Sequence, residues 1–219
     1  MTDEFEKKWQ ESQIKGWKDD KNEIVSFFER FGLRVSSLYE EVTNSRYDKM
    51  QIVCYLLSKI KKAIKICDYL DILEKEEHAD IDAIKIFFLI AHAEITMNNF
   101  GLRDSKSILV SNFFKPVMVK HRLNYRMRIS LENIKEVGGM SFSDILYKIR
   151  CEYAHEGNYT GKIFMTKKEE GVVNAFSFKS GGKDVFGECG LTYLELVNVY
   201  MEALVENIKE FLERNTYIV

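Results

Sequence analysis

One short segment of the sequence, YKIRCEYAHEGNY at residues 147–159, brings an arginine and a histidine together on what its apolar spacing predicts to be a single helix. Arg150 is followed after four residues by His155, and Gly157 then ends the helical pattern. Arginine carries a permanent charge and a planar fork of donors that fits phosphate oxygens. Histidine is the side chain that most readily takes up and releases a proton near neutral pH. These are the residue types that binding of a phosphate and transfer of a proton need.

The spacing of these two residues sets a geometric condition on that chemistry. Five residues turn an ideal helix by about 500°, so Arg150 and His155 lie roughly 140° apart around its axis. The two side chains do not share one face of a rigid helix. Either the helix loosens before Gly157, or a second copy of the chain supplies the matching residue. We therefore expect dimerisation to be part of the chemistry.

The apolar residues Ile145, Leu146 and Ile149 lead into the pair, and the segment closely resembles the R-x4–6-H motif of the HEPN superfamily. The members of this superfamily are the helical domains of many prokaryotic ribonuclease toxins and phage-defence proteins. The order of long helices, a late motif helix, a small insertion and a final helix is also similar. Outside the motif segment the resemblance is one of architecture only.

This resemblance implies a metal-independent endoribonuclease that needs no cofactor and works as a homodimer, with the two motif helices lining one cleft. His155 would take the proton of an RNA 2′-hydroxyl, and Arg150 would hold the phosphate. The implied products are a 2′,3′-cyclic phosphate and a 5′-hydroxyl. The implied setting is prokaryotic defence or a toxin–antitoxin pair, with RNA as substrate and an antitoxin or regulatory protein as a further partner.

Two positions depart from the motif of the active family members. Cys151 follows Arg150, where many active members carry a polar residue such as Asn, Asp or His. This favours an alternative, a catalytically inactive HEPN-like module that binds RNA, a nucleotide or a protein. Gly157 stands where another branch carries a tyrosine for adenylylation, so we do not expect that regulation. Cys151 and His155 are spaced as two metal ligands, but two ligands do not make a zinc site and no metal is expected.

A second signal is a run without acidic residues between Ser105 and Ser130, which holds six basic residues in a chain of net charge −2. Such a run suits the backbone of RNA, and its tyrosine offers a surface on which a base can stack. The residues predicted to bind RNA are Lys120, His121, Arg122, Tyr125, Arg126 and Arg128. The alternative is a solvated helix face whose charges pair with acidic residues elsewhere in the fold.

The apolar spacing predicts a mainly α-helical chain, and the fold class that we expect is a HEPN-like helical bundle with a small β-hairpin insertion between the last two long helices. The expected helices cover residues 3–12, 23–42, 48–73, 80–101, about 105–134 with a bend near Pro116, a motif helix from Ser141 or Ser143, and 191–215, with a solvated turn at 74–80. Two β-like runs at 162–166 and 172–178 predict the hairpin, and 180–184 predicts a loop. We expect one domain over 1–219, with a polar N-terminal helix or arm at 1–22 and the insertion at 160–190.

The composition limits the remaining classes of protein. The chain has 219 residues and is 46% hydrophobic, 13% aromatic and 30% charged, as is ordinary for a globular protein. No apolar run approaches the roughly 20 residues needed to cross a bilayer, and the start MTDEFEKKWQ is unlike a signal peptide. The four cysteines are widely separated, so we expect free thiols in a reducing cytoplasm. Phosphate-loop and G-x-S-x-G motifs do not occur. A further alternative is a helical scaffold in which Arg150 and His155 face solvent in a monomer.

Overall fold

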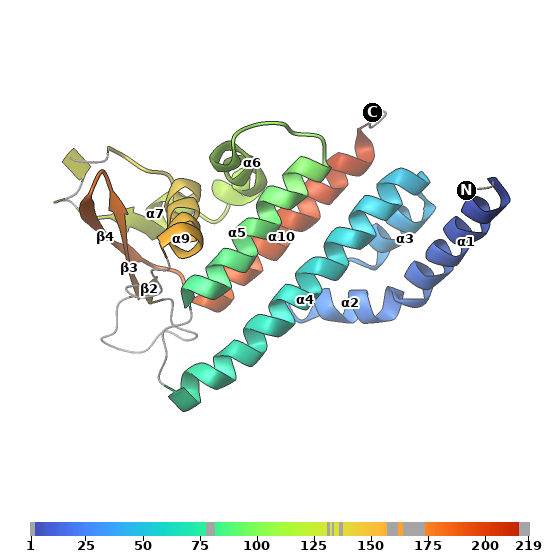
Figure 1. Ribbon diagram of the computed structural model, residues 1–219, viewed down its shortest axis with the longest axis horizontal. Coiled ribbons are helices and arrows are strands. Elements are labelled where there is room, and N and C mark those ends of the chain that lie inside the picture. The colour runs from blue at the N-terminus through green and yellow to red at the C-terminus, as the bar shows by residue number, and fades with distance from the viewer. Residues whose placement is uncertain are drawn as a thin grey trace. The chain divides into compact units, whose positions relative to one another are not determined.

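The computed structural model describes residues 3–77, 82–130, 132, 134–135, 138–156, 162–163 and 174–214. The chain is mainly helical with a small antiparallel sheet, as the sequence predicted (Figure 1). It divides into two compact units: the first contains the chain up to Lys62 and from Ile208 onward, and the second runs from Ala63 to Asn207. Two helices contribute to both units, so the single domain stays a prediction. None of the described helices combines the length and the apolar character that crossing a bilayer requires.

The first unit is built from short helices around the beginning of a long one. Its elements are α1 (Asp3–Asp19), α2 (Lys21–Glu29), α3 (Ser36–Asn44) and the first part of α4 (Tyr47–Glu77). The hydroxyl of Tyr39 on α3 donates a 2.6 Å hydrogen bond to the carbonyl of Trp17 on α1. The Lys49 ammonium of α4 donates to the carbonyls of Phe211 and Leu212 at 3.1 and 2.7 Å. This closes the C-terminal end of the last helix, where the carbonyls have no partners within the helix.

Two predictions about the first four helices are wrong, one in this unit and one in the end of α4, which belongs to the second unit. The sequence predicted one helix over 23–42, but Gly32 adopts φ 71° and separates α2 from α3. Glycine takes this left-handed conformation without steric penalty, and the amide of Leu33 turns back to the carbonyl of Phe28 at 3.3 Å. The predicted turn at 74–80 is also wrong over its first part, because α4 stays helical to Glu77. Its remainder lies outside the described residues.

The second unit carries the predicted motif helix. Its helices are the end of α4, α5 (Asp82–Asn99), α6 (Lys106–Met118), α7 (Leu123–Arg126), α9 (Phe142–Glu156) and α10 (Tyr193–Glu213) up to Asn207. Buried aromatic rings join these helices. Phe113 of α6 stacks on Tyr200 of α10 with ring centres 4.7 Å apart, and Phe114 meets Phe142 of α9 edge-on at 5.2 Å. These contacts fix α9 between its neighbours, since aromatic pairs add directional preference to apolar burial.

The predicted helix over about 105–134 is confirmed as far as Met118 and is wrong where the chain becomes a strand. Pro116 lies inside α6 without ending it, and the helix continues to Met118. The break comes later, at Arg122, whose φ of 50° is left-handed. A single turn of helix, α7, follows, and the chain then becomes the strand β1 (Met127–Ile129).

The sheet contains β1, β2 (Lys162–Ile163), β3 (Asn174–Ser180) and β4 (Lys183–Cys189) in the order β1-β4-β3-β2, all antiparallel. The predicted hairpin is confirmed by the pairing of Lys162 with Phe176, although its loop lies outside the described residues. The predicted loop at 180–184 is a tight turn between β3 and β4. The strand β4 itself was not predicted.

The buried face of this sheet packs on the motif helix. Phe176 and Phe178 of β3 are both 1% exposed, and their rings are parallel with centres 6.0 Å apart. Glu152 of α9 accepts a hydrogen bond from the backbone amide of Lys179. At Gly187 of β4 a Cβ atom would overlap the Phe176 ring and lie 2.5 Å from the carbonyl oxygen of Arg128. The sheet can therefore lie this close only because residue 187 has no side chain.

Candidate active site

The beginning of α9 is fixed by two sets of polar contacts. Ser141 and Asp144 form a reciprocal cap: the Ser141 amide donates to the Asp144 carboxylate at 3.1 Å, and the Asp144 amide donates to the Ser141 hydroxyl at 3.3 Å. The amide of Phe142 donates to the Asn124 side-chain oxygen at 2.9 Å, which ties α7 to this end of the helix. The predicted start at Ser141 is therefore confirmed, and the motif residues occupy the opposite end of α9.

Arg150 is buried against α5 rather than exposed to solvent. Its Nε atom lies 2.9 Å from one carboxylate oxygen of Glu94, and its Nη2 atom donates a 3.2 Å hydrogen bond to the other. The first contact is an ion pair without hydrogen-bond geometry. The side chains are 11% and 7% exposed, and the guanidinium carbon lies 5.7 Å from the centre of the Phe87 ring. Phe87 and Glu94 thus hold the plane of the arginine from one neighbouring helix.

Burial is the dominant influence on the Glu94 carboxyl. It raises the pKa of Glu94 above the ordinary value of 4.5, while the charges of Arg150 and Lys106 and the hydrogen bond from Arg150 act in the opposite direction. Lys106 is the first residue of α6, so the beginning of the predicted basic run lies close to this ion pair. The site therefore combines a buried carboxylate with two cations at short range.

Cys151, the departure from the motif, is partly buried beside Tyr147. Burial, and after it a hydrogen bond between its hydroxyl and the Cys151 thiol, raise the pKa of Tyr147 to about 12. Tyr147 precedes Cys151 by one helical turn, so the two side chains meet on the same side of α9. The thiol therefore contacts a protein hydroxyl and is not directed only toward solvent.

His155 is exposed in the last turn of α9 and makes no hydrogen bond or ion pair with a described residue. Because Arg150 is buried and His155 is exposed, the two side chains lie on different sides of the helix, in agreement with the expected 140°. Of the two alternatives, a loosening of the helix before Gly157 does not occur, since α9 stays helical to Glu156. One copy of the chain therefore does not bring the two motif residues together.

Part of the predicted RNA-binding set is occupied by acidic partners on α10. Lys120 and His121 both contact the carboxylate of Glu202, at 2.5 and 2.8 Å. Arg126 pairs with Glu195 at 2.7 Å. These contacts correspond to the alternative in which the basic run pairs with acidic neighbours. RNA binding by Lys120, His121 and Arg126 stays a prediction.

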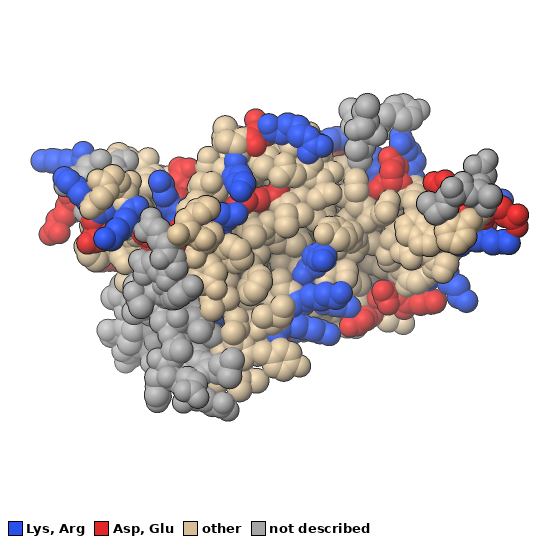
Figure 2. Space-filling view, in the orientation of Figure 1, with Lys and Arg blue, Asp and Glu red and all other residues tan. Residues whose placement is uncertain are grey.

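The rest of the set, Arg122, Tyr125 and Arg128, is exposed and has no acidic partner among the described residues. The backbone of Tyr125 connects them: its amide donates to the carbonyl of Arg122 at 2.9 Å, and its carbonyl accepts from Arg128 Nε at 2.8 Å. Because Asn124 contacts Phe142, this group lies near the beginning of α9, about 12 Å of helical rise from Arg150. Figure 2 shows Lys and Arg side chains among a few acidic ones in the region of β3 and β4.

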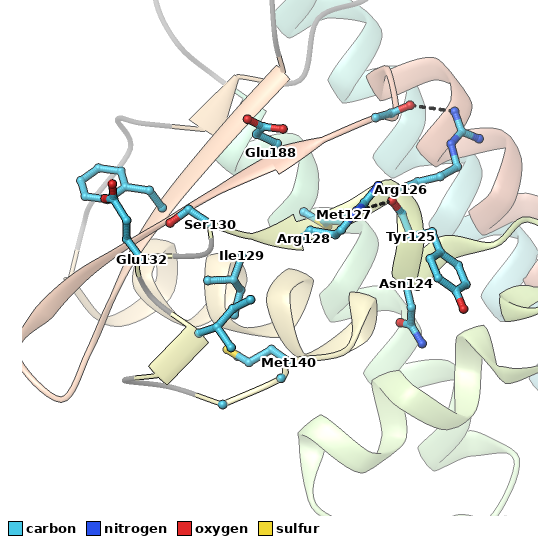
Figure 3. A pocket seen from close by; sticks show the side chains of 15 residues that line it. Asn124, Tyr125, Arg126, Met127, Arg128, Ile129, Ser130, Glu132, Met140 and Glu188 are labelled. Carbon is cyan, nitrogen blue, oxygen red and sulfur yellow. Dashed lines mark hydrogen bonds between the residues drawn. The ribbon is translucent and has the colours of Figure 1, made fainter.

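A hollow of about 960 Å³ opens beside β1, and we call it the β1 hollow. Exposed apolar side chains line it, with Tyr125 72% exposed, Phe186 57% and Ile134 41%. Arg128 and Glu188 contribute charged groups from adjacent strands. Figure 3 shows Arg128 turned toward the Tyr125 carbonyl, while Arg126 reaches away to the carbonyl of Gly190.

Sequence reasoning missed Glu94 and Phe87, which hold the motif arginine. One signal was present for Glu94, because it is an acidic residue within the otherwise apolar segment LIAHAEI. A carboxylate inside an apolar helix needs a partner, but the sequence does not say which one. His92 of the same segment was predicted to be a core or interface histidine; it is buried and lies 2.5 Å from the Tyr200 hydroxyl.

The described residues contain no group of three or more His, Cys, Asp or Glu side chains placed to hold a metal ion. Comparison of the chain with protein-family models, with curated proteins and with solved structures gives no match. A function can therefore be inferred only from the residues of α9 and their surroundings.

Proposed function

We propose that the chain is a HEPN-type, metal-independent endoribonuclease that works as a homodimer. The observation that carries this proposal is the arrangement on α9. Arg150 is held by Glu94 and Phe87, while His155, five residues later, is exposed and has no partner among the described residues. A fixed cation and a free histidine are the two groups that cleavage of an RNA phosphodiester by its own 2′-hydroxyl requires.

The proposed reaction is a phosphoryl transfer within the RNA chain, from the 5′-oxygen of one nucleotide to the 2′-oxygen of the nucleotide before it. His155 takes the proton of the 2′-hydroxyl as that oxygen attacks the adjacent phosphorus. The bond between phosphorus and the 5′-oxygen of the next nucleotide breaks, and this leaving oxygen takes a proton from water or from the second histidine of the dimer. The products are a 2′,3′-cyclic phosphate and a 5′-hydroxyl, so protons and bonds balance without an added reactant.

Arg150 supplies the charge that this transition state needs. Its Nε and Nη2 atoms face Glu94, whereas Nη1 makes no hydrogen bond with a described residue. Nη1 is therefore the nitrogen left for a phosphate oxygen. Because the guanidinium plane is already fixed, little reorganisation is needed when charge develops on the phosphate. The phosphate must nevertheless compete with Glu94 for the same cation.

The homodimer follows from the separation of the two motif residues. Arg150 and His155 lie on different sides of a helix that stays regular to Glu156. If two copies pair through α9 about a two-fold axis, His155 of one copy can face Arg150 of the other. An RNA strand then crosses between the copies. The family resemblance implies a role in prokaryotic defence or in a toxin–antitoxin pair. The protein would then act in the cytoplasm with an antitoxin or a regulatory protein as partner.

A second candidate is a HEPN-like binding module without catalysis. The observation that favours it is the environment of Arg150 and Cys151: the arginine is buried and already paired, and the thiol is engaged by Tyr147. Such a site can bind RNA, a nucleotide or a protein at the same surface without turning it over. The two candidates differ in one outcome, which is whether bound RNA is cleaved.

A cleavage assay on mixed cellular RNA in EDTA tests the proposal. The wild-type protein is compared with Arg150→Ala and His155→Ala, and the ends of the products are analysed chemically. Cleavage by the wild type alone, leaving cyclic-phosphate ends, is expected. Binding of RNA without cleavage by all three proteins would favour the binding module and overturn the nuclease.

A further inference from the structure

We propose that the β1 hollow holds a single-stranded segment of the RNA, with bases stacked on Tyr125 and Phe186 and a phosphate on Arg128. This inference rests on the proposed function in one respect, because it takes RNA as the substrate. It adds a second contact region, away from the motif end of α9, and it specifies an unpaired strand.

Two exposed aromatic side chains line the β1 hollow. Tyr125 and Phe186 are 72% and 57% exposed, and both line the same hollow from different elements. An exposed aromatic ring gains little from water, whereas an unpaired base has a free π-face that can stack on it. A duplex hides those faces within its own stack. Two rings at one hollow therefore favour a single strand.

Arg128 is placed to offer the hollow a positive charge. Met127 and Ile129 on either side of it are buried, so Arg128 points to the outer face of the sheet, opposite Glu188 on β4. Despite this position no ion pair joins Arg128 to an acidic side chain among the described residues. Its Nε atom donates to the backbone carbonyl of Tyr125, which fixes the guanidinium at the residue that carries the exposed ring (Figure 3). An arginine fixed at the same hollow as a stacking surface is suited to a phosphate of the strand whose bases stack there.

Glu188 indicates which bases the hollow would bind most tightly. A carboxylate repels the RNA backbone but accepts hydrogen bonds from base amino and imino groups. Glu188 makes no ion pair with a described residue, so its oxygens remain available. We therefore expect guanine, whose N1–H and N2–H donors lie side by side, to bind more tightly than uracil, whose single N3–H donor lies between two carbonyls that the carboxylate repels.

Binding of a fluorescent single-stranded RNA of about 12 nucleotides, a length within the site sizes of single-strand-binding modules, tests this proposal. The binding assay uses the His155→Ala protein in EDTA, so that cleavage does not alter the probe. In that background Tyr125→Ala and Phe186→Ala are each expected to lower the affinity about 5- to 100-fold, the range of one stacked base. Arg128→Gln is expected to weaken binding and to reduce its salt dependence by about one phosphate contact.

Matched controls come from the same chain. Tyr69→Ala removes an equally exposed tyrosine, 69% exposed on α4, and Arg103→Gln removes an arginine that donates to a backbone carbonyl as Arg128 does. Both controls are expected to bind RNA as the parent does. Thermal unfolding of every variant separates lost binding from lost folding, and little change is expected because the truncated side chains are exposed.

The outcomes separate this proposal from the nuclease. If Tyr125→Ala and Phe186→Ala bind the single strand as the parent does, or if a duplex of the same length binds equally well, the single-strand site is wrong. If both variants lose affinity while the protein with an intact His155 cleaves no RNA, the single-strand site is supported and the nuclease proposal is wrong. If the wild type cleaves RNA and the two variants cleave it with unchanged KM, the nuclease proposal is supported and the single-strand site is wrong.

Discussion

The guanidinium of Arg150 and the carboxylate of Glu94 form an ion pair within the second unit, with Nε and Oε1 2.9 Å apart and both side chains almost fully buried. Arg150 is the first residue of the sequence motif, and Glu94 lies on a helix that no motif pointed to. Taking two charges out of water is expensive, so such a pair is stable only when both partners are present. This dependence makes the pair open to direct measurement.

Removing one partner of this pair should destabilise the protein more than removing both. We expect Glu94→Leu or Arg150→Met alone to lower the free energy of unfolding by about 3–5 kcal/mol, because a buried charge is left unpaired. The double variant Glu94→Leu with Arg150→Met should lose less than either single variant, and therefore less than their sum. Urea unfolding measures all of these values. The exposed pair Lys8–Glu4 is the control, and Glu4→Gln should change stability very little. Additive losses at Glu94 and Arg150 would show that the two side chains are not coupled.

Glu94 should also give the protein a distinct dependence of stability on pH. Its folded pKa is raised above 4.5 because burial outweighs the attraction of its cations. A raised folded pKa contributes stability that is fully present below pH 4.5 and is lost as the pH rises through the folded value. The free energy of unfolding of the wild type minus that of Glu94→Gln should therefore decrease across this window. The difference cancels the carboxyls common to both proteins, and an increase with pH would contradict the assignment.

Gly187 should tolerate no side chain. A Cβ atom there would overlap the Phe176 ring and approach the carbonyl oxygen of Arg128. We expect Gly187→Ala to lower the free energy of unfolding by about 1–3 kcal/mol, the range for overpacking a filled site. Gly139→Ala is the matched control, since nothing lies within 4 Å of a Cβ atom at that position. Equal stability of the two variants would mean that β4 does not lie against β3 and β1 in this register.

The homodimer makes a prediction of its own for mixtures of two inactive variants. If each site takes Arg150 from one copy and His155 from the other, a heterodimer of Arg150→Ala with His155→Ala contains one complete site. Mixing and re-associating the two proteins should then restore part of the cleavage activity. If both residues of a site come from the same copy, every site in the mixture stays defective, and no activity returns.

The sequence predicted the helical class and the motif helix because the information for both is local. The apolar spacing of Ile145, Leu146 and Ile149 and the cap at Ser141 lie within one segment of the chain, and the structure confirms this helix. The position of His155 on a different side of the helix from Arg150 also followed from the helical repeat alone. Local patterns of this kind are the ones that sequence reasoning reads most reliably.

The features that the sequence did not predict depend on contacts between residues far apart in the chain or on positions without an apolar side chain. Apolar residues continue at helical spacing across Gly32, so periodicity could not show the break between α2 and α3. In β4 the inward position at Gly187 carries no apolar side chain, which hid the alternation of a strand. Glu94 lies 56 residues before Arg150, and only the packing of α5 on α9 brings them together. The partners of Lys120 and Arg126 on α10 were hidden for the same reason.

The most direct test of the account is the single-turnover rate of RNA cleavage at saturating RNA in EDTA, measured for the wild type, His155→Ala and a control histidine variant. His78→Ala is the control, because His78 has no role in the proposed chemistry. The account predicts that His155→Ala slows cleavage by about 10²- to 10⁴-fold, the usual contribution of a general base, and that His78→Ala cleaves at the wild-type rate. Cleavage by His155→Ala at the wild-type rate would contradict it.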